Sequence, residues 1–359
     1  MSRLATATIH LGALRRNLAR ARERAAGARV MAVIKADGYG HGLERVARAL
    51  ADADAFGVAA IADGRRLRAA GHRQRIVVLS GPDSRGDLDE LRRLDLDAVI
   101  HHPSQVEWLE ADRGSPLHVW LKLDSGMHRL GFPACGAETL HARLAALPSV
   151  ADDIILMTHF AASDEFDNDL TQRQISAFET ATRNIAGARS MSNSAGLLGW
   201  PAAHGDWLRV GGLLYGLSVV AGKSGADFGF EPAMTLSTRL IAINALQPGD
   251  RVGYAATWVA SEAMRIGVAA IGYGDGYPRR AANGTPVHVA GRPAALVGRV
   301  SMDLITIDLR QVPEARVGDP VLLWGADLPA ETIAEHADTI AYDLTCGMTR
   351  RVLFTEDER

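Results

Sequence analysis

The first candidate for chemistry in this sequence is a lysine that directly follows an apolar stretch. Residues 30–34 are all apolar and rich in β-branched types, which predicts a buried strand, and Lys35 comes next. Residues 36–42 then include three glycines, so the backbone there can approach a ligand closely. Desolvation at a strand end lowers the pKa of a lysine and frees its neutral amine to attack a carbonyl or to form a Schiff base. The alternative is a lysine whose stem packs on apolar neighbours while its ammonium reaches water.

Other charged and polar side chains stand at or near the ends of further apolar stretches. Each alone has an ordinary explanation, such as a charged loop, a satisfied core histidine or a serine-containing turn. If the stretches are parallel strands of one barrel, their carboxyl ends gather these side chains at one mouth. The candidates are Lys122, Arg129, His159, Asn193, Ser194, Arg209, Gly211 and Gly212.

The elements that must position these residues alternate in type over the first two thirds of the chain. Eight strand-like stretches are separated by helical patterns, which predicts an α/β fold with an N-terminal (β/α)8 TIM barrel over residues 6–228. An open, doubly wound sheet is the alternative. The predicted strands are Val30–Lys35, Phe56–Ile61, Ile76–Leu79, Asp97–Ile100, His118–Leu123, Ile154–His159, Arg189–Ser192 and Leu208–Leu214.

The pattern of the sequence changes near Gly229. Short β-rich stretches then alternate with Pro-Gly and Gly-Asp turn signals, which predicts a mainly β C-terminal domain over residues 229–359 together with residues 1–5. The opening Ala5–His10 also alternates like a strand and is expected to pair with that domain.

The composition limits the classes of function. With 359 residues and 47% hydrophobic content the chain can bury a large core, and its net charge of -3 leaves no basic face for nucleic acid. No stretch approaches the length that crosses a membrane. Two cysteines give neither a disulfide framework nor the spacing of a metal site, so no metal is expected and a reducing cytoplasm fits. The arginines between residues 15 and 24 are expected to form one solvent-exposed face of a helix.

Six motifs, in the same order and spacing, resemble the alanine racemases. The first is Lys-Ala-Asp-Gly-Tyr-Gly-His-Gly at 35–42, after an apolar strand. The others lie at residues 120–132, 206–216, 252–258, 271–279 and 298–303. The resemblance implies a cofactor, pyridoxal 5′-phosphate, held as an aldimine on Lys35. It also implies interconversion of L- and D-alanine, which supplies D-alanine for bacterial peptidoglycan.

The resemblance assigns roles to residues of the barrel. Arg129 contacts the phenolic oxygen of the cofactor and the substrate carboxylate, and Lys122 is a candidate for carbamylation, which would turn a cation into an anion that holds Arg129. Arg209 bonds the pyridine nitrogen, and His159 links it to the catalytic tyrosine. The remaining cofactor-binding residues are Tyr39, Asn193, Ser194, Gly211 and Gly212.

The resemblance also assigns roles to the β-rich part. Tyr254 is the second catalytic base, which takes the proton of the L-enantiomer while Lys35 takes that of the D-enantiomer. Met302 offers its backbone N–H to the substrate carboxylate. In the family the partner's β domain covers the barrel mouth, so a homodimer with shared sites is expected. The substrate entryway is formed by Asp164, Tyr273, Arg279 and Arg299.

Several alternatives remain open at this point. A serine or broad-specificity racemase shares all these motifs, a non-catalytic pyridoxal-phosphate-binding protein would not need Tyr254 and Met302, and a barrel decarboxylase would hold the carboxylate in an apolar slot. Three residues depart from the family pattern and leave pocket size and substrate breadth open: Gly212, Ser301 and Arg350.

Overall fold

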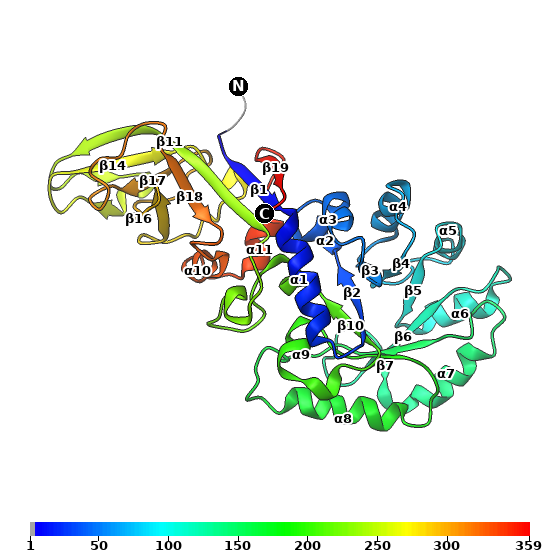
Figure 1. Ribbon diagram of the computed structural model, residues 1–359. Coiled ribbons are helices and arrows are strands. Elements are labelled where there is room, and N and C mark those ends of the chain that lie inside the picture. Colours follow the sequence, from blue (N-terminus) through cyan, green and yellow to red (C-terminus); the bar gives the residue numbers. More distant parts are fainter. Residues whose placement is uncertain (1–3) are drawn as a thin grey trace.

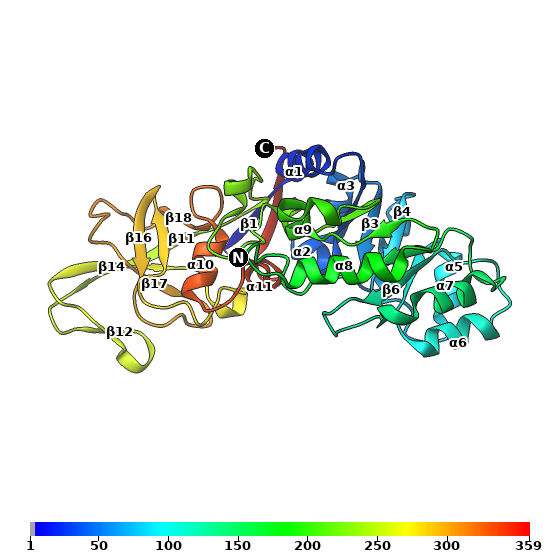
Figure 2. The same ribbon diagram turned by 90° about the horizontal axis from the view of Figure 1, so that it is seen from below.

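The protein is described here by a computed structural model that covers residues 4–359. A barrel of parallel strands and a mainly antiparallel β domain lie side by side (Figures 1 and 2). No helix within these residues is long and apolar enough to cross a membrane.

Eight parallel strands form the barrel, as predicted, in the order β10-β2-β3-β4-β5-β6-β8-β9. Backbone hydrogen bonds from Asp206 N to Arg189 O (2.9 Å) and from Arg209 N to Ser192 O (3.0 Å) join the two ends of this order. The open doubly wound alternative is therefore wrong. The strands are β2 (Arg29–Val33), β3 (Ala55–Val58), β4 (Arg75–Val78), β5 (Asp97–Ile100), β6 (Val119–Asp124), β8 (Ile155–Met157), β9 (Arg189–Ser190) and β10 (Trp207–Val210), and the short β7 (Phe132–Pro133) pairs with β6.

Helices lie around the outside of the barrel (Figure 1). In α1 the leucines at 11, 14 and 18 are buried, whereas the arginines between 15 and 24 are exposed, which confirms the predicted solvated face. The helices are α1 (Leu11–Arg24), α3 (Leu43–Ala49), α4 (Ile61–Ala69), α5 (Asp87–Arg93), α6 (Pro103–Ala111), α7 (Ala137–Ala145), α8 (Leu170–Thr182) and α9 (Ser194–Gly199).

The barrel has a packed interior. Inward-facing side chains of its strands form an apolar cluster of their own, separate from the larger core beneath the helices. Its buried members are Met31, Ala55, Val77, Val99, Trp120, Ile155, Met157 and Trp207. This filling closes the lower part of the barrel and leaves ligands to the loops at the carboxyl ends of the strands.

The second domain is a small barrel of antiparallel strands. β11 pairs with both β14 and β18, so the sheet β14-β17-β16-β15-β18-β11 closes on itself. β1 (Thr6–His10) adds to β11 and pairs in parallel with β19, which confirms the pairing expected for the opening strand. The other strands are β11 (Met234–Leu246), β12 (Arg251–Val252), β13 (Trp258–Val259), β14 (Met264–Ala269), β15 (Pro286–Val289), β16 (Arg292–Leu296), β17 (Ile305–Asp308), β18 (Pro320–Trp324) and β19 (Leu353–Asp357).

The segment after β18 returns to the barrel. It forms α10 (Ala330–His336) and α11 (Ala341–Cys346) before β19, and it lies where the two domains meet (Figure 1). The predicted domain limits at 5/6 and 228/229 stay predictions, although β1, which starts at residue 6, belongs to the second sheet.

Five of the eight predicted strands are longer than those observed: Val30–Lys35, Phe56–Ile61, Ile154–His159, Arg189–Ser192 and Leu208–Leu214. β3 ends at Val58, and Ile61 already begins α4. β10 ends at Val210, and Gly212–Tyr215 form a short 3-10 helix, η3. Beyond Val210 the apolar residues Leu213 and Leu214 are buried in η3, and beyond Val58 the half-buried Ile61 begins a helix, so an apolar pattern alone does not mark the end of a strand.

Candidate active site

Lys35 stands at the carboxyl end of β2 and begins an unusual turn, α2 (Lys35–Tyr39). The backbone φ is 52° at Ala36, 54° at Asp37 and 53° at Tyr39, all in the left-handed region. Each non-glycine residue there costs roughly 1–2 kcal/mol. Hydrogen bonds from Gly38 N to Ile34 O (2.9 Å) and from Leu43 N to Asp37 Oδ1 (3.1 Å) hold the turn. Stored backbone strain of this kind is characteristic of functional sites.

The environment of Lys35 lowers the pKa of its amine. Its side chain keeps contact with solvent, yet the surrounding protein removes enough water to lower its pKa below the ordinary value. The Arg129 guanidinium lowers this pKa further, and Arg209 contributes less. The shift increases the share of the neutral amine, which is the form that reacts with a carbonyl.

Arg209 is buried among backbone carbonyls at the end of β10. Its Nη1 donates to Ser190 O (2.8 Å), and its Nη2 donates to Thr158 O (2.7 Å) and lies 3.1 Å from His159 Nδ1. Only 4% of Arg209 is exposed, and this burial lowers its pKa to about 10. Its Nε–H has no acceptor among residues 4–359, which leaves one fixed donor for a ligand.

Lys122 is a second lysine in this mouth, on β6. It is 8% exposed, and burial, followed by the charges of Arg209 and Arg129, lowers its pKa to about 8. The only carboxylate close by in sequence, Asp124, accepts hydrogen bonds from its own loop, among them one from Gly126 N at 2.9 Å. The mouth therefore holds an excess of positive charge, which attracts an anion.

The opposite side of the mouth consists of hydroxyl groups and glycines. Ser194 Oγ accepts from Gly211 N (2.8 Å), and Asn193 caps α9 by accepting from Gly196 N (2.9 Å). A Cβ at Gly211 would lie 2.6 Å from Tyr39 Oη, so only glycine leaves room for that phenol. Burial raises the pKa of Tyr39 to about 12, which keeps its hydroxyl protonated as a donor.

Two aromatic residues of this region were not predicted from the sequence. Tyr215 stacks on Tyr39 with ring centroids 4.7 Å apart, and Tyr342 of α11 meets Tyr39 edge-on at 5.7 Å. A Cβ at Gly212 would collide with Tyr342 Oη. The small residue at position 212 therefore accommodates Tyr342 from the far end of the chain, a pairing that no local pattern reveals.

The structure gathers the barrel candidates but not the β-domain candidates. Tyr254 follows β12, which Figure 2 shows at the far end of the β domain from α2. It is 71% exposed and, with Arg299, lines a groove of 440 Å³ on its own domain. Met302 is 51% exposed. Within one chain, neither residue joins the site around Lys35.

The remaining predicted residues lie on the surface. Asp164 belongs to a barrel loop, whereas the other entryway candidates belong to the β domain. Arg350 is exposed at the start of the segment that leads to β19. The exposed entryway residues are Asp164, Tyr273, Arg279 and Arg299.

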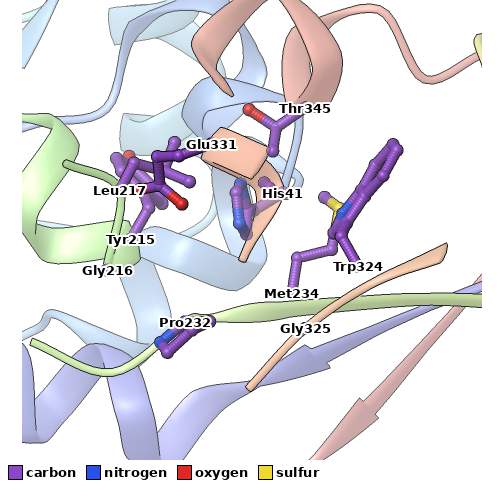
Figure 3. A pocket seen from close by; sticks show the side chains of 11 residues that line it. His41, Tyr215, Gly216, Leu217, Pro232, Met234, Trp324, Gly325, Glu331 and Thr345 are labelled. Atoms are coloured by element: carbon purple, nitrogen blue, oxygen red, sulfur yellow. The ribbon is translucent and has the colours of Figure 1, made fainter. Parts of the chain in front are cut away.

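A separate pocket at the junction of the two domains is too small for a cofactor. Its free volume is 10 Å³, and His41, Met234 and Trp324 project into it (Figure 3). Burial lowers the pKa of His41 to about 4. This neutral histidine belongs to the interior of the fold, and the mouth around Lys35 is the candidate active site.

Fold and site together define a (β/α)8-barrel protein with a reactive lysine in a cationic mouth and an appended β domain. The family model described as "Alanine racemase, N-terminal domain" matches residues 9–219, and "Alanine racemase, C-terminal domain" matches residues 233–355. The chain belongs to the alanine racemase family.

Relatives and solved structures cover almost the whole chain. It is 53% identical to an alanine racemase of Nitrosococcus oceani over 96% of this chain and 97% of the relative. It is 51% identical to one of Shewanella baltica over the same shares. The crystal structure of the biosynthetic alanine racemase of Pseudomonas aeruginosa superposes with a TM-score of 0.96 at 44% identity, covering 99% of this chain and 100% of that one. The alanine racemase of Acinetobacter baumannii gives a TM-score of 0.92 at 34% identity over the same shares.

Proposed function

We propose that this protein interconverts L-alanine and D-alanine with pyridoxal 5′-phosphate bound at Lys35. The observation that carries the proposal is the mouth itself, in which a partly desolvated lysine lies among strand ends that also carry a buried arginine and hydroxyl donors, with an excess of positive charge. The family supports the substrate, because the relatives from Nitrosococcus oceani and Shewanella baltica are named alanine racemases.

The residues fit the chemical groups of this cofactor. The neutral amine of Lys35 suits its aldehyde, and the unpartnered Nε–H of Arg209 suits its pyridine nitrogen. The hydroxyls of Tyr39 and Ser194 suit its phosphate. When bound, this cofactor supplies an electron sink that makes the α-proton of an amino acid acidic.

Arginine at position 209 has a chemical consequence. A guanidinium cannot readily give up a proton, and this one is fixed by three backbone carbonyls. It therefore donates a hydrogen bond without protonating the group it meets. An unprotonated pyridine nitrogen makes the bound cofactor a weaker electron sink. A weaker sink favours proton exchange at the α-carbon over side reactions.

Racemisation requires a proton carrier on each face of the substrate. Lys35, once free of the cofactor, holds or releases a proton at Nζ on one face, and its lowered pKa makes the neutral form accessible. Arg129 offers a planar fork that orients the substrate carboxylate. A phenol is a weak base at neutral pH, so Tyr254 needs a positive surrounding such as the barrel mouth provides.

The position of Tyr254 leads us to include a homodimer in the proposal. Tyr254 and Met302 are exposed on the β domain, and Val259 of β13, the strand that pairs with β12 just before Tyr254, is 45% exposed. Leu130 and Phe166, which neighbour Arg129 and Asp164 in the sequence, are each 41% exposed on the barrel. A two-fold arrangement would cover both apolar surfaces and bring the β domain of one chain to the mouth of the other.

Carbamylation of Lys122 is also part of the proposal, because its lowered pKa supplies the neutral amine that carbon dioxide requires.

We further place the protein in the cytoplasm, where the free thiols of Cys135 and Cys346 fit a reducing medium.

The proposal is tested by incubating purified protein and cofactor with single L-amino acids in D2O and measuring chirality and deuterium at the α-carbon. We expect alanine to racemise with incorporation of deuterium. Equal turnover of L-serine would instead indicate a broad-specificity racemase. Cofactor binding without any exchange would indicate a carrier protein, and release of carbon dioxide would indicate a decarboxylase.

A further inference from the structure

Arg351 lies between two loops of the β domain, outside the residues assigned to the site. Its Nε is 3.0 Å from Asp275 Oδ1, and its Nη2 donates to Asp303 Oδ1. Asp275 is completely buried, whereas the Asp303 side chain is 49% exposed. One guanidinium therefore connects the loop 272–276 to the loop 301–303.

The residues next to Arg351 hold the first loop by additional bonds. Thr349 N donates to Asp275 O (3.1 Å), and Thr349 Oγ1 donates to Gly274 O (3.0 Å). Gly272 N donates to Asp275 Oδ2 (3.0 Å), so the same buried carboxylate also closes the turn. The conformation of this loop therefore depends on the segment that contains Arg351.

The two loops are also bonded to each other. Tyr273 N donates to Ser301 O (3.0 Å), and Gly274 N donates to Met302 O (2.9 Å). A Cβ at Gly272 would collide with Ser301 O, so only glycine permits this approach. Tyr273 and Met302 are thereby held on neighbouring backbones while their side chains remain exposed.

The first of these bonds also orients Met302 N–H. Ser301 C=O and Met302 N–H belong to one planar trans peptide, so they point in opposite directions. When Tyr273 N–H holds the carbonyl, the direction of Met302 N–H is fixed as well. Met302 N–H is the group expected to meet the substrate carboxylate, and it has no acceptor among residues 4–359.

We propose that Arg351 is a positioning residue that orients Met302 N–H and Tyr273 toward the active site of the partner subunit. The inference rests on the proposed racemase function and its shared sites. A guanidinium can bridge two carboxylates with a fixed geometry, whereas a lysine is a point charge on a flexible stem. Arg351→Lys therefore keeps the charge beside buried Asp275 but loses the bridge to Asp303.

The alternative is that Arg351 acts on the active site of its own chain. The segment before Arg351 includes Thr345, whose carbonyl packs so closely on Gly40 that a Cβ there would collide with it. A disturbance of this segment could thus reach the Lys35 loop of the same subunit. The test must separate an effect on the partner's site from an effect on the chain's own site.

The first measurement compares holoenzyme variants as homodimers. For Arg351→Lys we expect KM for alanine to rise about tenfold while kcat stays within about threefold, because carboxylate binding rather than proton transfer is impaired. Arg310→Lys is the matched control, since Arg310 bridges Asp308 and Glu262 on the same domain, away from the two loops. Its KM should remain that of the wild type. Asp303→Asn, which weakens the outer contact by removing its negative charge, should raise KM in the same direction and keeps the inference testable if Arg351→Lys does not fold.

The second measurement uses differently tagged hybrids in which one chain carries Lys35→Ala, so that only the barrel of the other chain is competent. Arg351→Lys on the Lys35→Ala chain should raise KM of the single competent site, and on the other chain it should not. The reverse pattern would show that Arg351 acts through its own Lys35 loop, and an unchanged KM in both hybrids would show no positioning role. Either result overturns the inference. Failure of the proposed function itself is distinguishable, because the unsubstituted enzyme would then not racemise alanine.

Discussion

Nη2 of Arg209 lies 3.1 Å from Nδ1 of His159, and this contact sets the protonation of the histidine. A guanidinium can only donate, so Nδ1 must accept and the ring proton of the neutral imidazole is on Nε2. Burial, and then the charge of Arg209, lowers the pKa of His159 well below its ordinary value. The histidine can therefore pass on a hydrogen bond from Arg209 without adding charge.

We expect His159 to remain neutral throughout the range in which a free histidine titrates. Ring nitrogen NMR of labelled protein, assigned with His159→Gln, should show the Nε2–H tautomer at pH about 7 and still at about 5.5. Because the folded pKa is below the unfolded value, His159 destabilises the fold as pH falls through about 6.5. The stability of His159→Gln relative to the wild type should therefore improve on acidification. A doubly protonated ring at pH 5.5 would contradict the assignment.

Lys122 gives a prediction about covalent modification. Its neutral amine becomes more abundant as pH rises toward its pKa of about 8. Protein equilibrated with carbon-13-labelled carbon dioxide at pH about 8 should show a carbamate signal in NMR that weakens at pH about 6 and is missing in Lys122→Met. The exposed Lys223 offers a matched control, since Lys223→Met should keep the signal. A signal that survives Lys122→Met would assign the modification elsewhere.

Gly212 and Tyr342 should be energetically coupled, because a Cβ at position 212 would collide with the phenol. Gly212→Ala should destabilise the protein by roughly 1–3 kcal/mol through overpacking. The double variant with Tyr342→Leu should lose less stability than the sum of the losses of the two single variants, by about 1 kcal/mol or more. Gly86→Ala is the control, as φ there is -65° and its nearest neighbour would be Ser84 Oγ at 3.7 Å. Urea denaturation of the wild type, the two single variants, the double variant and the Gly86→Ala control measures each change in stability. Additive losses would mean that Tyr342 simply moves aside.

The sequence predicts the barrel and the location of its site because both depend on local patterns. Short β-branched stretches in alternation with helices indicate parallel strands, and the residues that follow such strands share one mouth. The position of Lys35 at the end of β2 was predictable for this reason. The five lengthened strands were wrong only at their ends, which the local pattern does not mark.

The details of the mouth were not predictable in this way. The glycines at 38, 40 and 42 indicate a flexible loop, but they do not indicate the left-handed backbone at Ala36, Asp37 and Tyr39, which is held by hydrogen bonds within residues 34–43. Tyr342 and Thr345 reach this region from the other end of the chain. Contacts of that sequence separation leave no local periodicity, and their partners are visible only once the fold is known.

The separation of Tyr254 from the Lys35 mouth within one chain predicts complementation between subunits. Homodimers of Lys35→Ala and of Tyr254→Phe should each be nearly inactive. Mild dissociation and reassociation of an equal mixture should give about half hybrids, each with one intact site and one site that carries both defects, so roughly a quarter of wild-type activity should return. Mass analysis of the mixture establishes that hybrids have formed. If they form and no activity returns, each chain uses its own Tyr254, and the two domains of a single chain must then close on each other during the reaction.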